Sequence, residues 1–128
     1  MSPVALVVDD SMLIRHTVCR YLEQRGFAVE SATNGKEALD LLKTVLPDVI
    51  ITDLMMPKMD GKELIAKLRG MPQTAAIPIV VISGRGGNGG EQSGANFIIY
   101  KDIGIENQLQ KALLQALGSE ALETHSPS

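Results

Sequence analysis

Short runs rich in apolar residues alternate with amphipathic stretches along the chain, and this alternation constrains the fold more than any other feature. The runs cover residues 4–8, 27–32, 48–52, 77–82 and 96–100. Such runs are long enough for buried strands and too short for helices. Strands that alternate with helices form right-handed βαβ units, so the chain is expected to fold into a parallel sheet covered by helices.

Four amphipathic helices are expected between and after these runs, because apolar residues recur there every three or four positions. Polar residues able to cap a helix stand before the first two of them. The apolar positions at helical spacing are Leu13, Ile14, Val18, Tyr21 and Leu22; Ala38, Leu41, Leu42 and Val45; Leu64, Ile65 and Leu68; and Ile105, Leu109, Ala112, Leu113 and Ala116. Five strands and four helices define a small α/β sandwich.

The size and charge of the chain exclude several classes of function. At 128 residues we expect one domain over residues 1–118, followed by a flexible tail over residues 119–128. A net charge of −3 without a Lys/Arg cluster argues against direct nucleic-acid binding. No apolar run approaches the roughly 18 residues of a membrane span. The single cysteine, Cys19, fits a reducing compartment, so we expect a soluble, cytoplasmic protein with no membrane partner.

Acidic, hydroxyl and amine side chains follow the predicted strands where each strand ends. In chain order they are Asp9 and Asp10 after the first strand, Asp53 after the third, Ser83 after the fourth and Lys101 after the fifth. Ligands of open α/β sheets bind just beyond the carboxyl ends of the strands, so chemistry is expected at these positions. One strand-ending acid is often only a turn former or a helix cap. Five such residues in this order are far more specific.

With the run Met56-Pro57-Lys58-Met59-Asp60-Gly61 behind Asp53, the chain resembles the receiver domain of two-component response regulators, the chemotaxis-regulator type of fold. The resemblance covers residues 4–117. It implies a flavodoxin-like, three-layer sandwich whose five-stranded parallel sheet has the order 2-1-3-4-5. Strands 1 and 3 are neighbours in that order, which would bring Asp9 and Asp10 into one cleft with Asp53.

Three carboxylates in one cleft raise one another's pKa and destabilise the fold unless a cation neutralises them. Mg²⁺ suits a site of carboxylates, a main-chain carbonyl, waters and phosphate oxygens. By resemblance, the carboxylates of Asp10 and Asp53 and the main-chain carbonyl of Met55 would bind Mg²⁺ directly. Asp9 would bind it through water. The alternative is a structural ion-pair network, but three acids against one lysine leave uncompensated charge.

The resemblance also implies that Asp53 is the phosphoacceptor, forming an aspartyl-phosphate with a group taken from a histidine kinase or a histidine phosphotransfer protein. Lys101 would supply positive charge to the transferred group, and the Ser83 hydroxyl would bond a phosphoryl oxygen. This chemistry is positioning and charge neutralisation. We therefore expect a signalling domain, not an enzyme, that assists its own phosphotransfer and dephosphorylation. No output domain is visible, so the chain would act by protein contact unless it is part of a longer protein.

The sequence departs from the family pattern around the fourth and fifth strands. Ser83 replaces the commoner threonine, and Ile98 stands where the family often has an aromatic residue. Asp102 stands where the family usually has a proline, often with a cis peptide before it. The loop either carries a strained cis peptide or becomes trans and shifts Lys101. Asp102 itself either caps the last helix or acts directly on Lys101.

The segment 83–94 is about one helical turn shorter than usual and rich in glycine, which disfavours a helix. We therefore expect the family's fourth helix to be absent or reduced to a turn around residues 91–93, and the segment to be mobile. Residues 84–89 also match the dinucleotide-binding pattern G-x-G-x-x-G. Too few residues follow for the helix that this motif must open, so a flexible loop is the better interpretation.

These departures leave a second interpretation open. It is a pseudo-receiver, a protein-interaction module with this fold whose regulation no longer uses phosphate. Against it, all five site residues are present, and a decayed site usually loses an acid or the lysine first. A third class is a phosphotransferase or phosphatase with an aspartate nucleophile. Such an enzyme should carry a second acid two residues after the nucleophile, where this chain has Met55.

Overall fold

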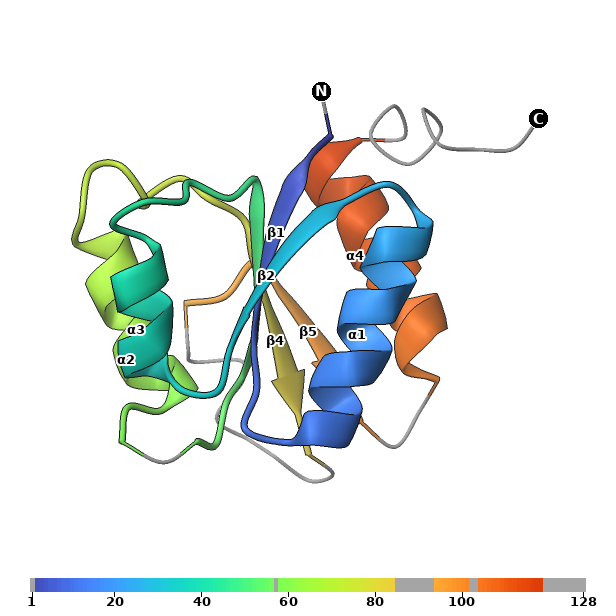
Figure 1. Cartoon of the computed structure of the whole chain (residues 1–128), viewed down its shortest axis with the longest axis horizontal. Helices are drawn as coiled ribbons and strands as arrows, with labels where there is room; N and C mark the ends of the chain where they lie inside the picture. Colours follow the sequence, from blue (N-terminus) through green and yellow to red (C-terminus); the bar gives the residue numbers. More distant parts are fainter. Residues whose placement is uncertain (1, 57, 85–93, 102–103, 119–128) are drawn as a thin grey trace.

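Five parallel strands form one sheet at the centre of the described part of the molecule (Figure 1). The structure is a computed structural model that describes residues 2–56, 58–84, 94–101 and 104–118. The strands are β1 (Val4–Val8), β2 (Ala28–Ala32), β3 (Val49–Asp53), β4 (Ile79–Ser83) and β5 (Phe97–Tyr100). Their order is β2-β1-β3-β4-β5, which confirms the predicted sheet and fold class.

Helices cover both faces of this sheet (Figure 1). One face carries α1 (Met12–Gln24) and α4 (Ile105–Leu117), and the other carries α2 (Gly35–Leu41) and α3 (Gly61–Arg69). In the described part of the chain, none of these helices has the length and apolar character needed to span a bilayer.

Two expectations fall on segments that the structure does not describe. The helix labelled α4 is the last one among the described residues, and it is the helix that the sequence places over residues 105–116. The family's own fourth helix would fall within 84–94, and residues 85–93 lie outside the described residues. The predicted tail over residues 119–128 lies outside them too. Both expectations therefore stay predictions.

Each face of the sheet has its own apolar core, because successive strand residues point to opposite faces. In β1, Ala5 and Val7 pack in the core under α1 and α4, whereas Leu6 and Val8 pack in the core under α2 and α3. The central strands β3 and β4 are buried along their whole length, as is typical of a parallel sheet. β2 forms an edge of the sheet and is mostly exposed, which explains its weaker apolar pattern.

Side-chain caps fix the start of three helices. Ser11 caps α1, Asn34 caps α2 and Asp60 caps α3, each accepting a hydrogen bond from the main-chain N–H three residues further on. Leu13 has helical spacing with the apolar stripe of α1, as the sequence indicates, but its side chain is 73% exposed. Helical spacing fixes the face of a helix only to within a neighbouring position, and Leu13 lies beyond the edge of the buried stripe.

Arg69, in the last turn of α3, joins three segments at the amino-terminal edge of the sheet. Its guanidinium donates to four oxygens: the main-chain carbonyls of Ala75, Ile77 and Gly94 at 2.9, 2.8 and 3.3 Å, and Asn96 Oδ1 at 2.7 Å. Asn96 Oδ1 also accepts the main-chain N–H of Ile79 at 2.8 Å. The point where the glycine-rich connection rejoins the sheet is thereby fixed to both α3 and β4.

We expect Arg69→Met to lower the free energy of unfolding by about 1–2 kcal/mol, because it removes charge-assisted hydrogen bonds while keeping an apolar stem. Urea unfolding followed by circular dichroism measures the change. Lys62→Met is the matched control, since Lys62 is an exposed residue of the same helix. An equal loss in both variants would contradict a specific role of the Arg69 contacts.

Candidate functional site

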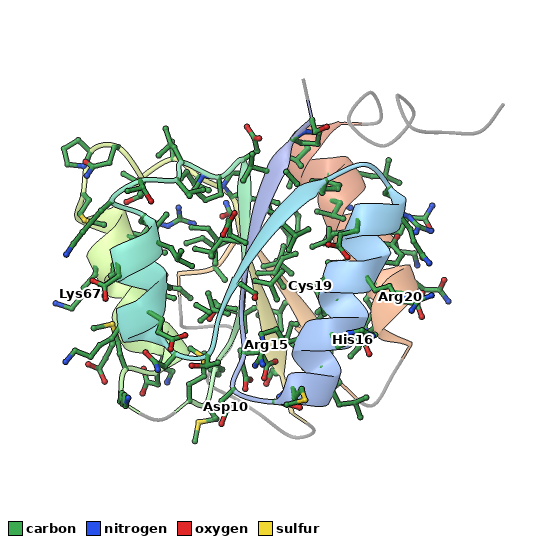
Figure 2. The ribbon with its side chains drawn as sticks, viewed as in Figure 1. Asp10, Arg15, His16, Cys19, Arg20 and Lys67 are labelled. Atoms are coloured by element: carbon green, nitrogen blue, oxygen red, sulfur yellow. The ribbon has the colours of Figure 1, made fainter. Side chains whose placement is uncertain are left out.

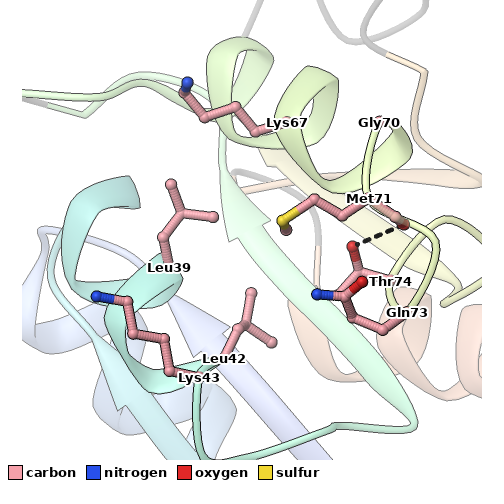
Figure 3. A pocket seen from close by; sticks show the side chains of 8 residues that line it. All are labelled: Leu39, Leu42, Lys43, Lys67, Gly70, Met71, Gln73 and Thr74. Atoms are coloured by element: carbon pink, nitrogen blue, oxygen red, sulfur yellow. Dashed lines mark hydrogen bonds between the residues drawn. The ribbon is translucent and has the colours of Figure 1, made fainter.

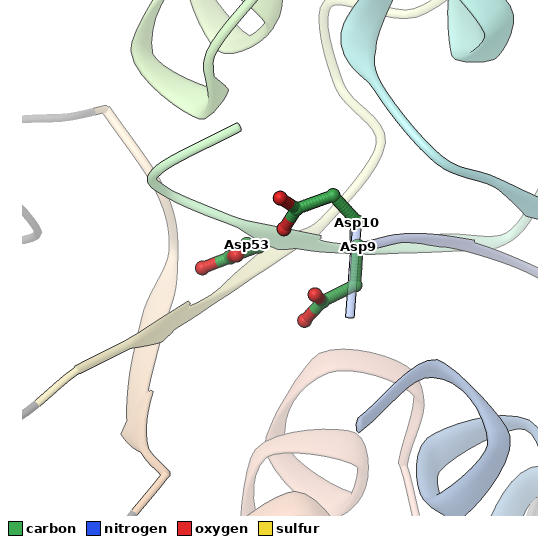
Figure 4. A group of neighbouring side chains, drawn as sticks. All are labelled: Asp9, Asp10 and Asp53. Carbon is green, nitrogen blue, oxygen red and sulfur yellow. The ribbon is translucent and has the colours of Figure 1, made fainter. Parts of the chain in front are cut away.

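Three acidic side chains meet at the carboxyl ends of β1 and β3 (Figure 4). These strands are neighbours, with Val8 beside Thr52 in the register, so the residues that follow β1 lie next to the residue that ends β3. One carboxylate oxygen from each of Asp9, Asp10 and Asp53 lies within 4.8 Å of the others. The structure thus brings together the three acids that the sequence analysis places in one cleft.

Lys101 faces these acids from the end of β5. Its Nζ lies 3.2 Å from Asp53 Oδ2 and 3.9 Å from Asp9 Oδ2. β4 separates β5 from β3, so the flexible stem of the lysine must extend across the end of β4 to reach them. Asp102 lies outside the described residues, as does the peptide that joins it to Lys101. The two alternatives for that loop therefore stay open.

Ser83 ends β4 beside these groups, and Met55 follows Asp53 in the next loop. The Ser83 side chain is 2% exposed, and its hydroxyl donates to the main-chain carbonyl of Gly84 at 3.2 Å. The Met55 side chain is 76% exposed, and its main-chain N–H donates to the Asp53 carboxylate, as does that of Leu54 at 2.8 Å. The role of Ser83 toward a phosphoryl group and that of the Met55 carbonyl toward a metal stay predictions.

Gly61 allows the loop after β3 to fold back onto the main chain of Asp53. A Cβ atom at residue 61 would overlap the carbonyl oxygen of Asp53 and lie 2.9 Å from Leu54 Cα. The Gly61 N–H donates to the Leu54 carbonyl at 2.9 Å. Only glycine permits this close approach of two main-chain segments. Gly61 is recognisable in the sequence as part of the run after Asp53, but nothing in the sequence predicts this contact.

Burial makes two acids of the cleft, Asp9 and Asp53, costly to ionise. Asp9 is 0% exposed and Asp53 is 3% exposed. Burial raises the pKa of Asp9 to about 6; the charges of Asp53 and Asp10 act in the same direction, and the Ser11 N–H and Lys101 act against it. Burial also raises the pKa of Asp53 above its ordinary value, against the opposing charge and hydrogen bond of Lys101.

The donor set fits a hard divalent cation. Asp9 Oδ2 is buried and accepts no hydrogen bond from the described residues, although Lys101 Nζ lies 3.9 Å away. A buried carboxylate oxygen without a partner costs free energy that a bound cation would remove. The three acids offer oxygen ligands, which are the ligands that Mg²⁺ prefers. The chemistry of the cleft is therefore that of charge neutralisation around oxygen atoms.

A hollow between α2 and the end of α3 has a different character (Figure 3). Its volume is about 470 Å³, its lining includes the apolar Leu39, Leu42 and Met71, and Lys43 and Lys67 stand beside them. No acid is among the described residues that line it. It therefore shares no group with the acidic cleft.

Comparison with known proteins identifies the family. Residues 5–114 match the response regulator receiver domain, so the chain belongs to that family. Response regulator MprA of Mycobacterium tuberculosis (strain ATCC 25177 / H37Ra) is 36% identical over 121 residues, covering 90% of this chain and 52% of MprA. The chain thus spans about half the length of the curated relatives it matches.

Solved structures of receivers share the fold. The chemotaxis response regulator CheY4 of Vibrio cholerae is 32% identical with a TM-score of 0.81, covering 91% of this chain and 100% of that one. The receiver domain of sensor histidine kinase PA1611 from Pseudomonas aeruginosa PAO1 is 21% identical with a TM-score of 0.84, covering 92% and 99%. That structure has a magnesium ion coordinated in its active-site cleft. The predicted family and the flavodoxin-like fold are therefore confirmed.

Asp9→Asn is expected to stabilise the metal-free protein at pH 7.5 by roughly 1–3 kcal/mol. The folded-state pKa of Asp9, about 6, exceeds its ordinary value of 3.8. Between about pH 4 and pH 6 the folded protein therefore holds a proton on Asp9 that the unfolded chain has lost, so the free energy of unfolding falls as the pH rises through this range. At pH 7.5 the whole of this loss is present. Asparagine removes that loss and can still accept the Ser11 N–H.

Thermal and urea unfolding in EDTA measure this difference, which should shrink when the pH is lowered toward 4. Asp40→Asn is the control, because it removes the same charge from an exposed residue, whose carboxylate lies 3.3 Å from Lys43 Nζ. A metal-free Asp9→Asn protein less stable than the wild type at pH 7.5 would show that the buried charge is already compensated.

Proposed function

We propose that Asp53 accepts a phosphoryl group in a Mg²⁺-dependent reaction and that the chain signals by contact with another protein. The observation that carries this proposal is the meeting of three carboxylates with Lys101, whose Nζ lies 3.2 Å from Asp53 Oδ2. Membership of the receiver family supports a phosphoacceptor at this position. Residues 1–118 would form the receiver domain and residues 119–128 a tail.

Mg²⁺ would be held by the carboxylates of Asp10 and Asp53 and by the main-chain carbonyl of Met55, with Asp9 bound through water. The bound metal supplies positive charge that neutralises the carboxylates and the incoming phosphoryl oxygens. The unpartnered, buried Asp9 Oδ2 supports a cation at this place. So does the magnesium ion in the cleft of the PA1611 receiver, a protein with the same fold.

The side chains of the cleft would divide the work of phosphotransfer. A carboxylate oxygen of Asp53 forms the new bond to phosphorus while the bond to the donor nitrogen breaks. Lys101, paired with Asp53 beforehand, would turn to a phosphoryl oxygen. The Ser83 hydroxyl would exchange its bond to the Gly84 carbonyl for a bond to another phosphoryl oxygen. The same groups would assist dephosphorylation, which makes the domain a participant in its own chemistry without being an enzyme.

The donor would be a protein that carries a phosphohistidine, either a histidine kinase or a histidine phosphotransfer protein. Three large apolar side chains that lie within three residues of an acid of the cleft in the sequence are exposed: Met12 by 75%, Leu13 by 73% and Met55 by 76%. Met12 and Leu13 begin α1 just after Asp10, and Met55 follows Asp53 by two residues. Clustered exposed apolar side chains are typical of protein-binding surfaces. A small phosphodonor such as acetyl phosphate would not need contacts with these side chains.

Protein partners and a cytoplasmic location fit the low basic charge and the single cysteine of this chain. Direct contact with nucleic acid is not part of the proposal, and this concerns only the chain itself, since MprA is about twice as long. The pseudo-receiver remains the alternative. Its remaining support in the described residues is Ile98, which replaces an aromatic residue at the half-buried edge strand β5.

Incubation with Mg²⁺ and acetyl phosphate is expected to add one phosphate, seen by intact-mass spectrometry, and the addition should disappear in EDTA. Asp53→Asn should abolish it, because the amide is not a nucleophile here, whereas the exposed Asp40→Asn should leave it unchanged. A protein that no small or protein donor modifies would favour the pseudo-receiver.

Leu13→Ser is expected to slow transfer from a phosphorylated protein donor about tenfold, since truncating one interface residue costs roughly 1–2 kcal/mol. Transfer from acetyl phosphate should not change. The protein donor for this experiment is chosen from a panel of phosphorylated histidine kinases and phosphotransfer proteins, as the one that transfers its phosphoryl group to the wild type fastest. Leu46→Ser is the control. Leu46 is 62% exposed and precedes β3, so it lies toward the amino-terminal ends of the strands, away from the acids at their carboxyl ends. Equal slowing with both kinds of donor would refute docking through Leu13.

A further inference from the structure

Arg15, in the first turn of α1, reaches back to the loop that carries the first two acids. Its Nη1 donates to the main-chain carbonyl of Asp9 at 2.7 Å, and the side chain is half-buried. Figure 2 shows Arg15 at the same end of the molecule as Asp10. Arg20, further along the helix, lies on its outer side and is exposed (Figure 2).

The hydrogen bond from Arg15 completes the fixation of Asp9. The N–H of Asp9 donates to the Ala32 carbonyl at 3.1 Å, and Oδ1 accepts the Ser11 N–H at 2.8 Å. With its carbonyl bonded to Arg15, Asp9 has one open atom, Oδ2, which is buried and lacks a hydrogen-bond partner among the described residues. Oδ2 is also the Asp9 atom that faces Lys101. Asp9 is therefore held so that one oxygen is presented to the cleft.

The carbonyl that Arg15 holds belongs to the peptide unit between Asp9 and Asp10. This unit is planar, so fixing its oxygen also fixes the main-chain nitrogen of Asp10 and limits the directions open to the Asp10 side chain. Asp10 is exposed, and its carboxylate makes no hydrogen bond within the described parts of the chain. Among the described residues, the peptide unit that Arg15 holds is therefore the fixed group from which the Asp10 side chain starts.

We propose that Arg15 is a positioning residue for the cation site: it orients Asp9 and Asp10 together through the peptide unit that joins them. The inference rests on the proposed function, because the cation is the proposed Mg²⁺. A guanidinium has no acceptor and cannot be a ligand itself. Its positive charge repels a nearby cation. Any gain in Mg²⁺ affinity from Arg15 must therefore come from geometry, which allows the two effects to be separated by experiment.

The test compares Arg15→Met, Arg15→Lys and the matched control Arg20→Met with the wild type in an NMR titration with Mg²⁺. We expect Arg15→Met to weaken Mg²⁺ binding about tenfold, the range seen when groups that orient metal ligands are removed. Arg15→Lys should recover most of the affinity, because an ammonium can also donate to the Asp9 carbonyl. Arg20→Met, which removes the same groups from the same helix, should bind Mg²⁺ like the wild type.

Metal-free measurements keep the test independent of the cation. In Arg15→Met without Mg²⁺, the amide signals of Asp10 and Ser11 should shift and their hydrogen exchange should accelerate. Unchanged signals there overturn the inference. So does an unchanged Mg²⁺ affinity in a less stable protein, which would mean a role in stability only. Tighter Mg²⁺ binding overturns it as well, since Arg15 would then act only through its charge.

The two proposals fail differently. If the wild type and Arg15→Met bind Mg²⁺ equally and are phosphorylated equally, the positioning role is wrong and the proposed function stands. If the wild type neither binds Mg²⁺ nor takes up phosphate from acetyl phosphate, the proposed function is wrong. The metal-free signals of Asp10 and Ser11 then still decide whether Arg15 orients the loop.

Discussion

The parallel pairing of β1 with β3 is the constraint on which the site depends. It places the end of one buried strand beside the start of the loop that follows the other, so two carboxylates with little access to water share one cleft. The charge of Lys101, the main-chain N–H groups of Leu54 and Met55 and the contact from Arg15 all act on that cleft. Because burial still raises the pKa of both carboxyl groups, these partners do not fully compensate their ionisation.

The sequence predicts this fold well where a strand is buried on both faces. β1 has the expected bounds and β3 is displaced by one residue, because continuous apolar runs leave little choice of boundary. β4 starts two residues later than the apolar pattern, since Pro78 cannot donate in the ladder. The strand order came from the family resemblance and not from periodicity. Leu13 shows the limit of periodicity, because an apolar residue on a helix can serve the core or a binding surface.

The acids and Lys101 could be assigned to one site from their places after the strands, but the contacts that hold them could not. Gly61 and Arg15 act on main-chain atoms, and nothing in a residue type tells which carbonyl it approaches. One signal was available for Arg15. It lies four residues after the cap Ser11, and residues four apart share a helix face, which places its side chain over the loop before the helix.

The absent side chain at residue 61 has a mechanical meaning. Gly61 is both the first residue of α3 and the residue that touches the main chain of Asp53, with no side chain between them to absorb a shift. The two main-chain segments cannot move closer together, so a displacement of the Asp53 main chain toward Gly61 must also move the start of α3. A shift of the Asp53 main chain is therefore passed directly to the start of α3.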